Sequence, residues 1–144
     1  MKSITYSTES TIPAPVGRVF ELLTDPARMA SWLPAVKAVQ AEREGPVRKG
    51  SRLRVLYEGR ETEIEVIDFN PNKVFGWIER VGRSHWKTFF RLDFAGTSTQ
   101  ITIQQVWDPP SVFALLRVRL QPHRNVPARL NMMVQNLRME ASKD

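Results

Sequence analysis

The prolines between residues 11 and 34 constrain the fold of this chain more than any other feature. Pro13 and Pro15 cannot donate to a β-ladder, so a strand at the start of the chain has to end near Ile12. Pro15 suits the first turn of a helix, where its missing N–H is not needed. Apolar residues then recur at the spacing of one helix face, at Val16, Val19, Phe20 and Leu23. The segment therefore predicts a strand followed at once by a short helix.

A second short helix is predicted directly after the first. Thr24 must leave the helical region because Asp25 and Pro26 follow it. Asp25 can cap a new helix and Pro26 can open it, and the helical pattern then continues to about Trp32.

From residue 36 to residue 107 the apolar period changes from helical to two, which is typical of half-buried strands. In the clearest strand, Glu61, Glu63 and Glu65 alternate with Thr62, Ile64 and Val66. This alternation places the three glutamates on a solvent face rather than in a site of paired carboxylates. Short turns rich in Gly, Pro and Asn separate the runs, so we expect an antiparallel meander of six strands with the first strand joined to an edge.

After Pro110 the helical period returns and persists to the end of the chain. A broad apolar face comes first, at Val112, Phe113, Leu115, Leu116, Val118 and Leu120. Pro122 and Pro127 interrupt it, so the helix is expected to break or kink there, and a final helix starts near Pro127. Its apolar stripe is Leu130, Met133, Val134 and Leu137. The predicted fold is one α+β domain over residues 1–144. In it a curved antiparallel sheet wraps around a long C-terminal helix, and a cavity remains between the sheet and the helix.

Several of these segments resemble the START-like superfamily, also called Bet v 1-like or SRPBCC, which includes the polyketide cyclase/dehydrase family. The residues that carry the resemblance are Ile12-Pro13-Ala14-Pro15, the run from Val19 to Pro26, Trp32-Leu33-Pro34, and Gly45-Pro46 with Gly50. The resemblance implies a helix-grip fold with seven strands, and an apolar pocket rather than a shared catalytic motif.

The inward faces of the predicted strands and helices supply the candidate pocket lining. It comprises Leu53, Val55, Tyr57, Ile64, Val66, Trp77, Trp86, Thr88, Phe90, Ile103, Gln105, Trp107, Phe113, Leu116, Leu130 and Val134. Tyr57, Thr88 and Gln105 place hydrogen-bonding groups on an otherwise apolar wall, as small-molecule sites do. Core polar residues satisfied by their neighbours would give the same pattern.

Candidates for catalysis are few: Glu79, Tyr57 and His85. Glu79 is a buried acid or base if Phe75 and Trp77 face inward, and it is solvated if the other face of that strand does. The chain has two histidines and no cysteine, so it carries no metal-site signature, and no cofactor is expected.

The net charge of +6 is concentrated in one segment. Residues 109–139 contain five arginines and no Asp or Glu. This segment suits an anionic membrane or an acidic partner, or it is a solvated helix face whose arginine stems cover apolar surface. No aromatic ladder alternates with the arginines, which disfavours nucleic acid as a partner. With no signal-like or membrane-spanning run, a cytoplasmic location is expected, as a monomer or homodimer.

Three functions remain open on these grounds. The first is binding of a small hydrophobic molecule such as a lipid, isoprenoid, quinone or aromatic polyketide. The second is a cyclase/dehydrase enzyme that positions its substrate beside one acid/base group. The third is an interaction protein that docks through its basic C-terminal segment.

Overall fold

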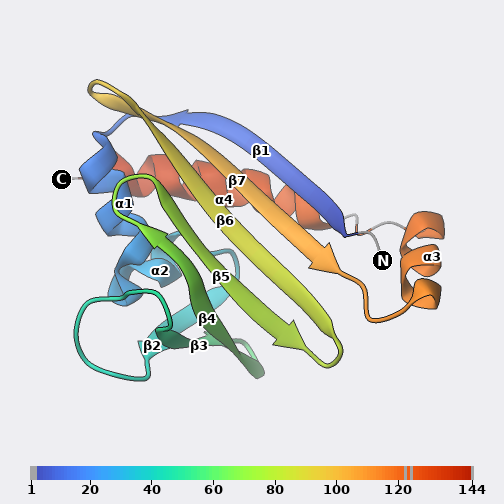
Figure 1. The fold of residues 1–144 in the computed structure, drawn as a ribbon. Coiled ribbons are helices and arrows are strands. Elements are labelled where there is room, and N and C mark those ends of the chain that lie inside the picture. The colour runs from blue at the N-terminus through green and yellow to red at the C-terminus, as the bar shows by residue number, and fades with distance from the viewer. Residues whose placement is uncertain (1–2, 122, 124, 144) are drawn as a thin grey trace.

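The computed structural model describes residues 3–121, 123 and 125–143, which form a curved antiparallel sheet packed against helices (Figure 1). Along the chain the elements are β1 (Ile4–Ile12), α1 (Val16–Thr24), α2 (Pro26–Trp32), β2 (Val36–Ala41), β3 (Arg52–Tyr57), β4 (Arg60–Asn70), β5 (Val74–Val81), β6 (Ser84–Ala95), β7 (Ser98–Asp108), α3 (Val112–Leu120) and α4 (Asn125–Ala141). The hydrogen-bonded order of the strands is β1-β7-β6-β5-β4-β3-β2. The predicted meander, with the first strand added at one edge, is confirmed.

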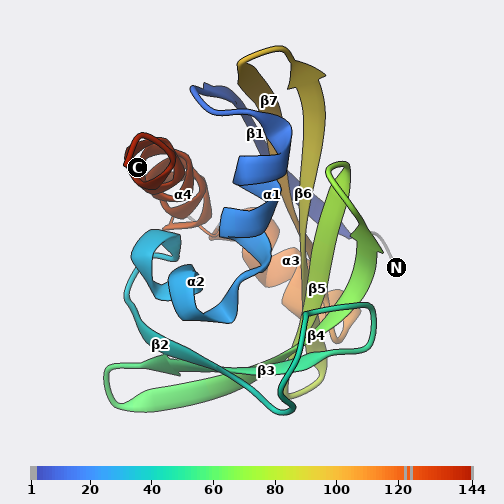
Figure 2. The same ribbon diagram turned by 90° about the vertical axis from the view of Figure 1, so that its left-hand side faces the viewer.

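Helices α1, α2 and α4 all lie on the concave side of the sheet (Figure 2). The long helix α4 packs beside β1, and α1 and α2 fill the remaining space at the end where α4 finishes (Figures 1 and 2). The α+β helix-grip arrangement expected from the order of the elements is therefore confirmed.

The proline-rich segment folds as its residues predict. β1 ends at Ile12, and Pro15 is the extended residue that precedes α1. Asp25 then caps α2, because its side-chain oxygen accepts a hydrogen bond from the Ala27 N–H at 3.0 Å. Pro26 opens α2 without losing a hydrogen bond, since the first helical N–H has no partner in the helix.

Trp32, the last residue of α2, lies at the centre of an aromatic core. Its side chain is fully buried, and its indole N–H donates to the carbonyl oxygen of Leu22 at 3.1 Å. The ring meets Phe90 edge-to-face at 5.4 Å between centroids and lies 6.4 Å from Trp77. These contacts join the helical layer to the sheet.

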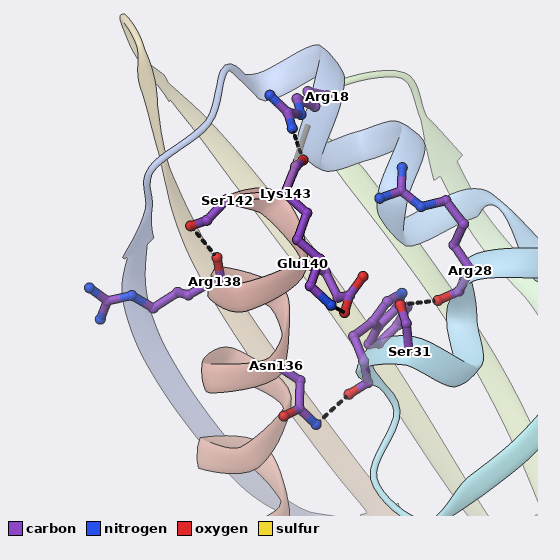
Figure 3. Close-up of polar contacts among 9 residues, drawn as sticks. Arg18, Arg28, Ser31, Asn136, Arg138, Glu140, Ser142 and Lys143 are labelled. Carbon is purple, nitrogen blue, oxygen red and sulfur yellow. Dashed lines mark hydrogen bonds and ion pairs between the residues drawn. The ribbon is translucent and has the colours of Figure 1, made fainter.

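Polar contacts tie the C-terminal part of α4 to the two short helices (Figure 3). Asn136 donates through Nδ2 to the carbonyl oxygen of Trp32 at 3.2 Å. Just beyond α4, the carbonyl of Lys143 accepts a hydrogen bond from the Arg18 guanidinium. Leu137 and Ala141 are buried on the face of α4 that points into the core. This half of α4 is therefore fixed on both its apolar and its polar sides.

The C-terminal region forms two separate helices rather than one interrupted helix. α3 ends at Leu120, and α4 begins at Asn125, two residues before the expected start at Pro127. The predicted break is present, although Pro122 lies outside the described residues. Of the nine residues of α3, Leu115 is the only one that is buried. The helix stands out from the body beyond the end of β7 (Figure 1).

Candidate functional site

A cavity of about 250 Å³ lies between the concave face of the sheet and the N-terminal half of α4. Strands β3 to β7 form its floor and walls, and α4 covers it. Its lining residues are Leu33, Val55, Tyr57, Arg60, Ile64, Trp77, Glu79, Val81, Trp86, Thr88, Gln105, Arg129 and Met133. Arg60, Val81 and Arg129 are exposed and mark the side on which the cavity meets solvent.

Sequence periodicity placed seven of its proposed pocket residues on this wall: Val55, Tyr57, Ile64, Trp77, Trp86, Thr88 and Gln105. It missed Leu33, Arg60, Val81, Arg129 and Met133 as lining residues. Met133 lay on the predicted apolar stripe of the last helix, so that signal was present. The sequence holds no signal that Arg60 and Arg129 line a pocket, because a charged residue next to a turn or on a helix is normally expected to face solvent.

The remaining proposed lining residues do not border this cavity. Six belong to the core where the curled sheet meets the short helices and α4: Leu53, Val66, Phe90, Ile103, Leu130 and Val134. Trp107 is also buried, but it packs against Trp86 and His123. Phe113 and Leu116 are a larger departure, because they are 84% and 48% exposed on α3. They face solvent because α3 separates from α4 instead of continuing along the sheet.

The face of β5 that carries Glu79 is the inward one. Glu79 pairs directly with Ile64 of β4 and with Trp86 of β6, and all three line the cavity. The opposite face carries Gly76, where a Cβ atom would come within 2.5 Å of the Phe89 ring on the outer side of β6. Glu79 is half-buried, so its carboxylate is available to a molecule in the cavity.

His85 lies on the other face of the sheet from Trp86, as neighbours in a strand do. It pairs with Asp108 of β7, whose carboxylate also meets Lys87 Nζ at 3.4 Å. Of the three catalytic candidates, Glu79 and Tyr57 therefore share the cavity, and His85 stands apart from it.

The Tyr57 phenol on the cavity wall has a pKa above its ordinary value. Burial raises the pKa of its phenol, and the nearby charge of Glu79 raises this pKa further. Arg129 and Arg60 act in the opposite direction. The Arg60 guanidinium lies over the Tyr57 ring, with Cζ 4.1 Å from the centroid. The phenol is thus a neutral hydrogen-bonding group at neutral pH.

Gln105 and Thr88 form a hydrogen-bonded pair in the buried part of the cavity wall. They are register partners on β7 and β6, with exposed fractions of 6% and 2%. Gln105 Nε2 donates to Thr88 Oγ1 at 3.1 Å. Gln105 Oε1 is buried and has no partner among the described residues.

His123 belongs to an aromatic cluster with Trp86 and Trp107, on the same side of the sheet as the cavity. Its ring lies 5.1 Å from the Trp86 ring and 4.8 Å from the Trp107 ring, between centroids. The Tyr6 hydroxyl and His123 Nδ1 are 2.9 Å apart. Burial lowers the pKa of His123, which favours the neutral ring, and an unprotonated Nδ1 can accept a hydrogen bond from the Tyr6 hydroxyl.

We expect this histidine to make the protein less stable in weak acid. A group whose folded pKa is lowered binds fewer protons in the folded state than in the unfolded one. The contribution of neutral His123 to the free energy of unfolding is therefore fully present above the ordinary histidine pKa of 6.5. It is lost as the pH falls from there through the lowered pKa of the folded state. Urea unfolding between pH 7.5 and about pH 5 measures the loss. The His123→Phe variant should show a smaller decline, and an identical decline would contradict this assignment.

Two other hollows are less suited to a ligand. One of about 550 Å³ is lined only by the single segment from Ala41 to Leu53, whose side chains are mostly exposed. Another lies on the outer face of the sheet, beside Phe89 and Gln104.

Within the described residues no group of three His, Cys, Asp or Glu side chains is arranged to hold a metal. No described helix has the length and apolar character needed to span a bilayer.

Residues 3–131 match the profile of the family described as polyketide cyclase / dehydrase and lipid transport. The Zhui aromatase/cyclase from Streptomyces sp. R1128 superposes with a TM-score of 0.74 at 16% identity, covering 97% of this chain and 94% of that one. Ginseng major latex-like protein 151 from Panax ginseng gives a TM-score of 0.74 at 12% identity, covering 98% and 99%. A protein of Chromobacterium violaceum gives 0.71 at 18% identity, covering 97% and 98%. At these identities the structural likeness shows the fold alone. No curated protein matches the sequence significantly.

Proposed function

Because this chain belongs to the polyketide cyclase / dehydrase and lipid transport family, we propose that it binds and carries a small hydrophobic molecule in the cavity under α4. The observation that carries the proposal is the cavity itself, which joins apolar walls to a few convergent polar groups. Trp77, Trp86 and Met133 offer flat and adaptable apolar surface to such a molecule. The arginines at the opening give it a polar end that reaches solvent.

Native mass spectrometry of the protein purified from its source organism tests this proposal. We expect a bound species of low mass that is released on denaturation and extracts into organic solvent. The protein expressed in an unrelated host and delipidated serves as the control, and it should regain the mass shift when incubated with that extract. Protein that is free of ligand from its own source, and that takes up nothing from a hydrophobic extract, contradicts the proposal.

An enzymatic function of the cyclase/dehydrase type is favoured by one specific observation. Glu79 faces the cavity within electrostatic reach of the Tyr57 phenol, so an acid/base group and a proton donor share one site. The Glu79→Gln variant separates the two functions, because it removes proton transfer and keeps the shape of the cavity. If the extracted ligand is converted by the wild type and only bound by the variant, the protein is an enzyme.

The exposed helix α3 supports contact with an anionic membrane, where a hydrophobic ligand would be collected or delivered. Phe113, Leu116 and Leu120 are exposed at the spacing of one helix face. Arg117 and Arg119 lie in the last turn, and the surrounding residues 109–139 contain no acidic side chain. An apolar face bordered by arginines matches the chemistry of an anionic bilayer surface.

Vesicle co-sedimentation measures this contact. We expect binding to vesicles with 30% phosphatidylglycerol in phosphatidylcholine, and about tenfold weaker binding after Arg117→Ser with Arg119→Ser. Phe113→Ser should weaken binding too, whereas Phe94→Ser, a change at an exposed phenylalanine of the β6–β7 hairpin, should leave it unaltered. If α3 variants instead abolish dimers seen by analytical ultracentrifugation and leave vesicle binding unchanged, the face binds a second copy.

A further inference from the structure

The buried carbonyl oxygen of Gln105 is a hydrogen-bond acceptor that the described part of the protein leaves unused. The side chain is more than nine-tenths buried, and its Nε2 is committed to Thr88. Reversing the amide would pair the oxygen with the threonine and leave the nitrogen without a partner instead. In either orientation one polar atom of the amide is unpaired, and native proteins nearly always satisfy such an atom.

The place of this amide in the cavity separates it from the charged groups. Arg60 and Arg129 are exposed and Glu79 is half-buried, so water reaches all three. Gln105 lies on the covered wall, where its register partner Thr88 is also the register partner of Trp77. Gln105 contributes to the cavity lining with Trp77 and Trp86, and its Oε1 is covered, so a donor on a molecule held there pairs with this oxygen once the amide turns toward the cavity.

We infer that Gln105 selects ligands that carry a hydroxyl or N–H group on an otherwise apolar skeleton, with that donor directed at Oε1. The inference rests on the proposed function and assigns its ligand class. A ligand that presents only C–H groups here keeps the oxygen unpaired. A site with a buried hydrogen-bonding group rejects a ligand that lacks the matching group more strongly than an apolar pocket rejects a ligand of slightly different size.

The test is a cycle of two probes and two proteins. The probes are 2-naphthol and 2-methylnaphthalene, which differ by a hydroxyl in place of a methyl group. Each is titrated calorimetrically into wild type and into Gln105→Met, which keeps the length of the side chain and removes the amide. The greater hydrophobicity of the methyl probe is the same for both proteins and cancels in the cycle.

We expect the preference for 2-naphthol, expressed as the ratio of the two dissociation constants, to be about tenfold greater in wild type than in Gln105→Met. Gln104→Met is the matched control, since Gln104 is the adjacent residue and faces the groove on the outer side of the sheet. Its ratio should equal that of wild type. Gln105→Met removes the unpaired oxygen and also the donor to the buried Thr88 Oγ1, so its thermal midpoint is measured first to show that the variant is folded; Gln105→Leu serves as a second variant.

Equal ratios in wild type and Gln105→Met would overturn the inference while leaving the proposed function intact. An equal loss of preference in Gln104→Met would also overturn it, because the effect would not belong to the cavity. If wild type binds neither probe, the proposed function fails and the inference fails with it.

Discussion

Replacing Trp32 with alanine is expected to lower the free energy of unfolding by about 3–5 kcal/mol, as for other fully buried aromatic residues. The ring touches Phe90 and Trp77 on the sheet, so its removal leaves a void between the helical layer and the strands. The change also removes the N–H that the carbonyl of Leu22 accepts. Because a domain of this size is stable by only about 5–15 kcal/mol, the loss is a large fraction of the total.

Urea unfolding followed by far-ultraviolet circular dichroism measures the effect, since it does not depend on the deleted fluorophore. Trp32→Phe keeps an aromatic ring but loses the hydrogen bond, and it should cost less than the alanine variant. Phe94→Ala removes a phenylalanine that is 77% exposed, and it should change stability by no more than about 0.5 kcal/mol. A loss below about 1 kcal/mol for Trp32→Ala would show that the core does not depend on this ring.

Filling the cavity from α4 should abolish ligand binding. Met133 is 2% exposed and contributes to the lining, so Met133→Trp places an indole in the space that a ligand needs. We expect affinity for a bound hydrophobic probe such as 2-naphthol to fall at least about a hundredfold, or about 2.7 kcal/mol. Titration calorimetry measures the loss.

The neighbouring residue provides the control for this change. Met132 is 49% exposed on the other side of α4, and Met132→Trp should bind the probe as wild type does. Overpacking by Met133→Trp can cost about 1–3 kcal/mol of stability, so both variants are first shown to be folded by their thermal midpoints. Unchanged binding by folded Met133→Trp would place the ligand elsewhere in the molecule.

The fold could be predicted from the sequence because its signals are local. Prolines and Asp25 act within one turn of the chain, and alternation in strands such as β4 reports which side of the sheet is covered. The unpaired oxygen of Gln105 could not be predicted, because it depends on a partner in another strand. The orientation of Glu79 became clear only from its pairing with Ile64 and Trp86.

The exposed face of α3 shows where periodicity fails. Phe113 and Leu116 have the spacing of a core helix, and spacing cannot distinguish a face covered by this chain from a face left open. Whether this face is covered depends on the direction that the chain takes after β7, and here α3 is a helix separate from α4. The same apolar residues that indicated a pocket lining therefore lie on the surface.

The position of α4 after all seven strands has a consequence for synthesis on the ribosome. Every strand and both short helices leave the ribosome before α4, so the sheet can pair with α1 and α2 in place while the part of the concave face under α4 is still open. Until α4 docks, the nascent chain exposes an open apolar trough rather than an enclosed cavity. A large or rigid ligand can enter at that stage without passing the opening beside Arg60 and Arg129.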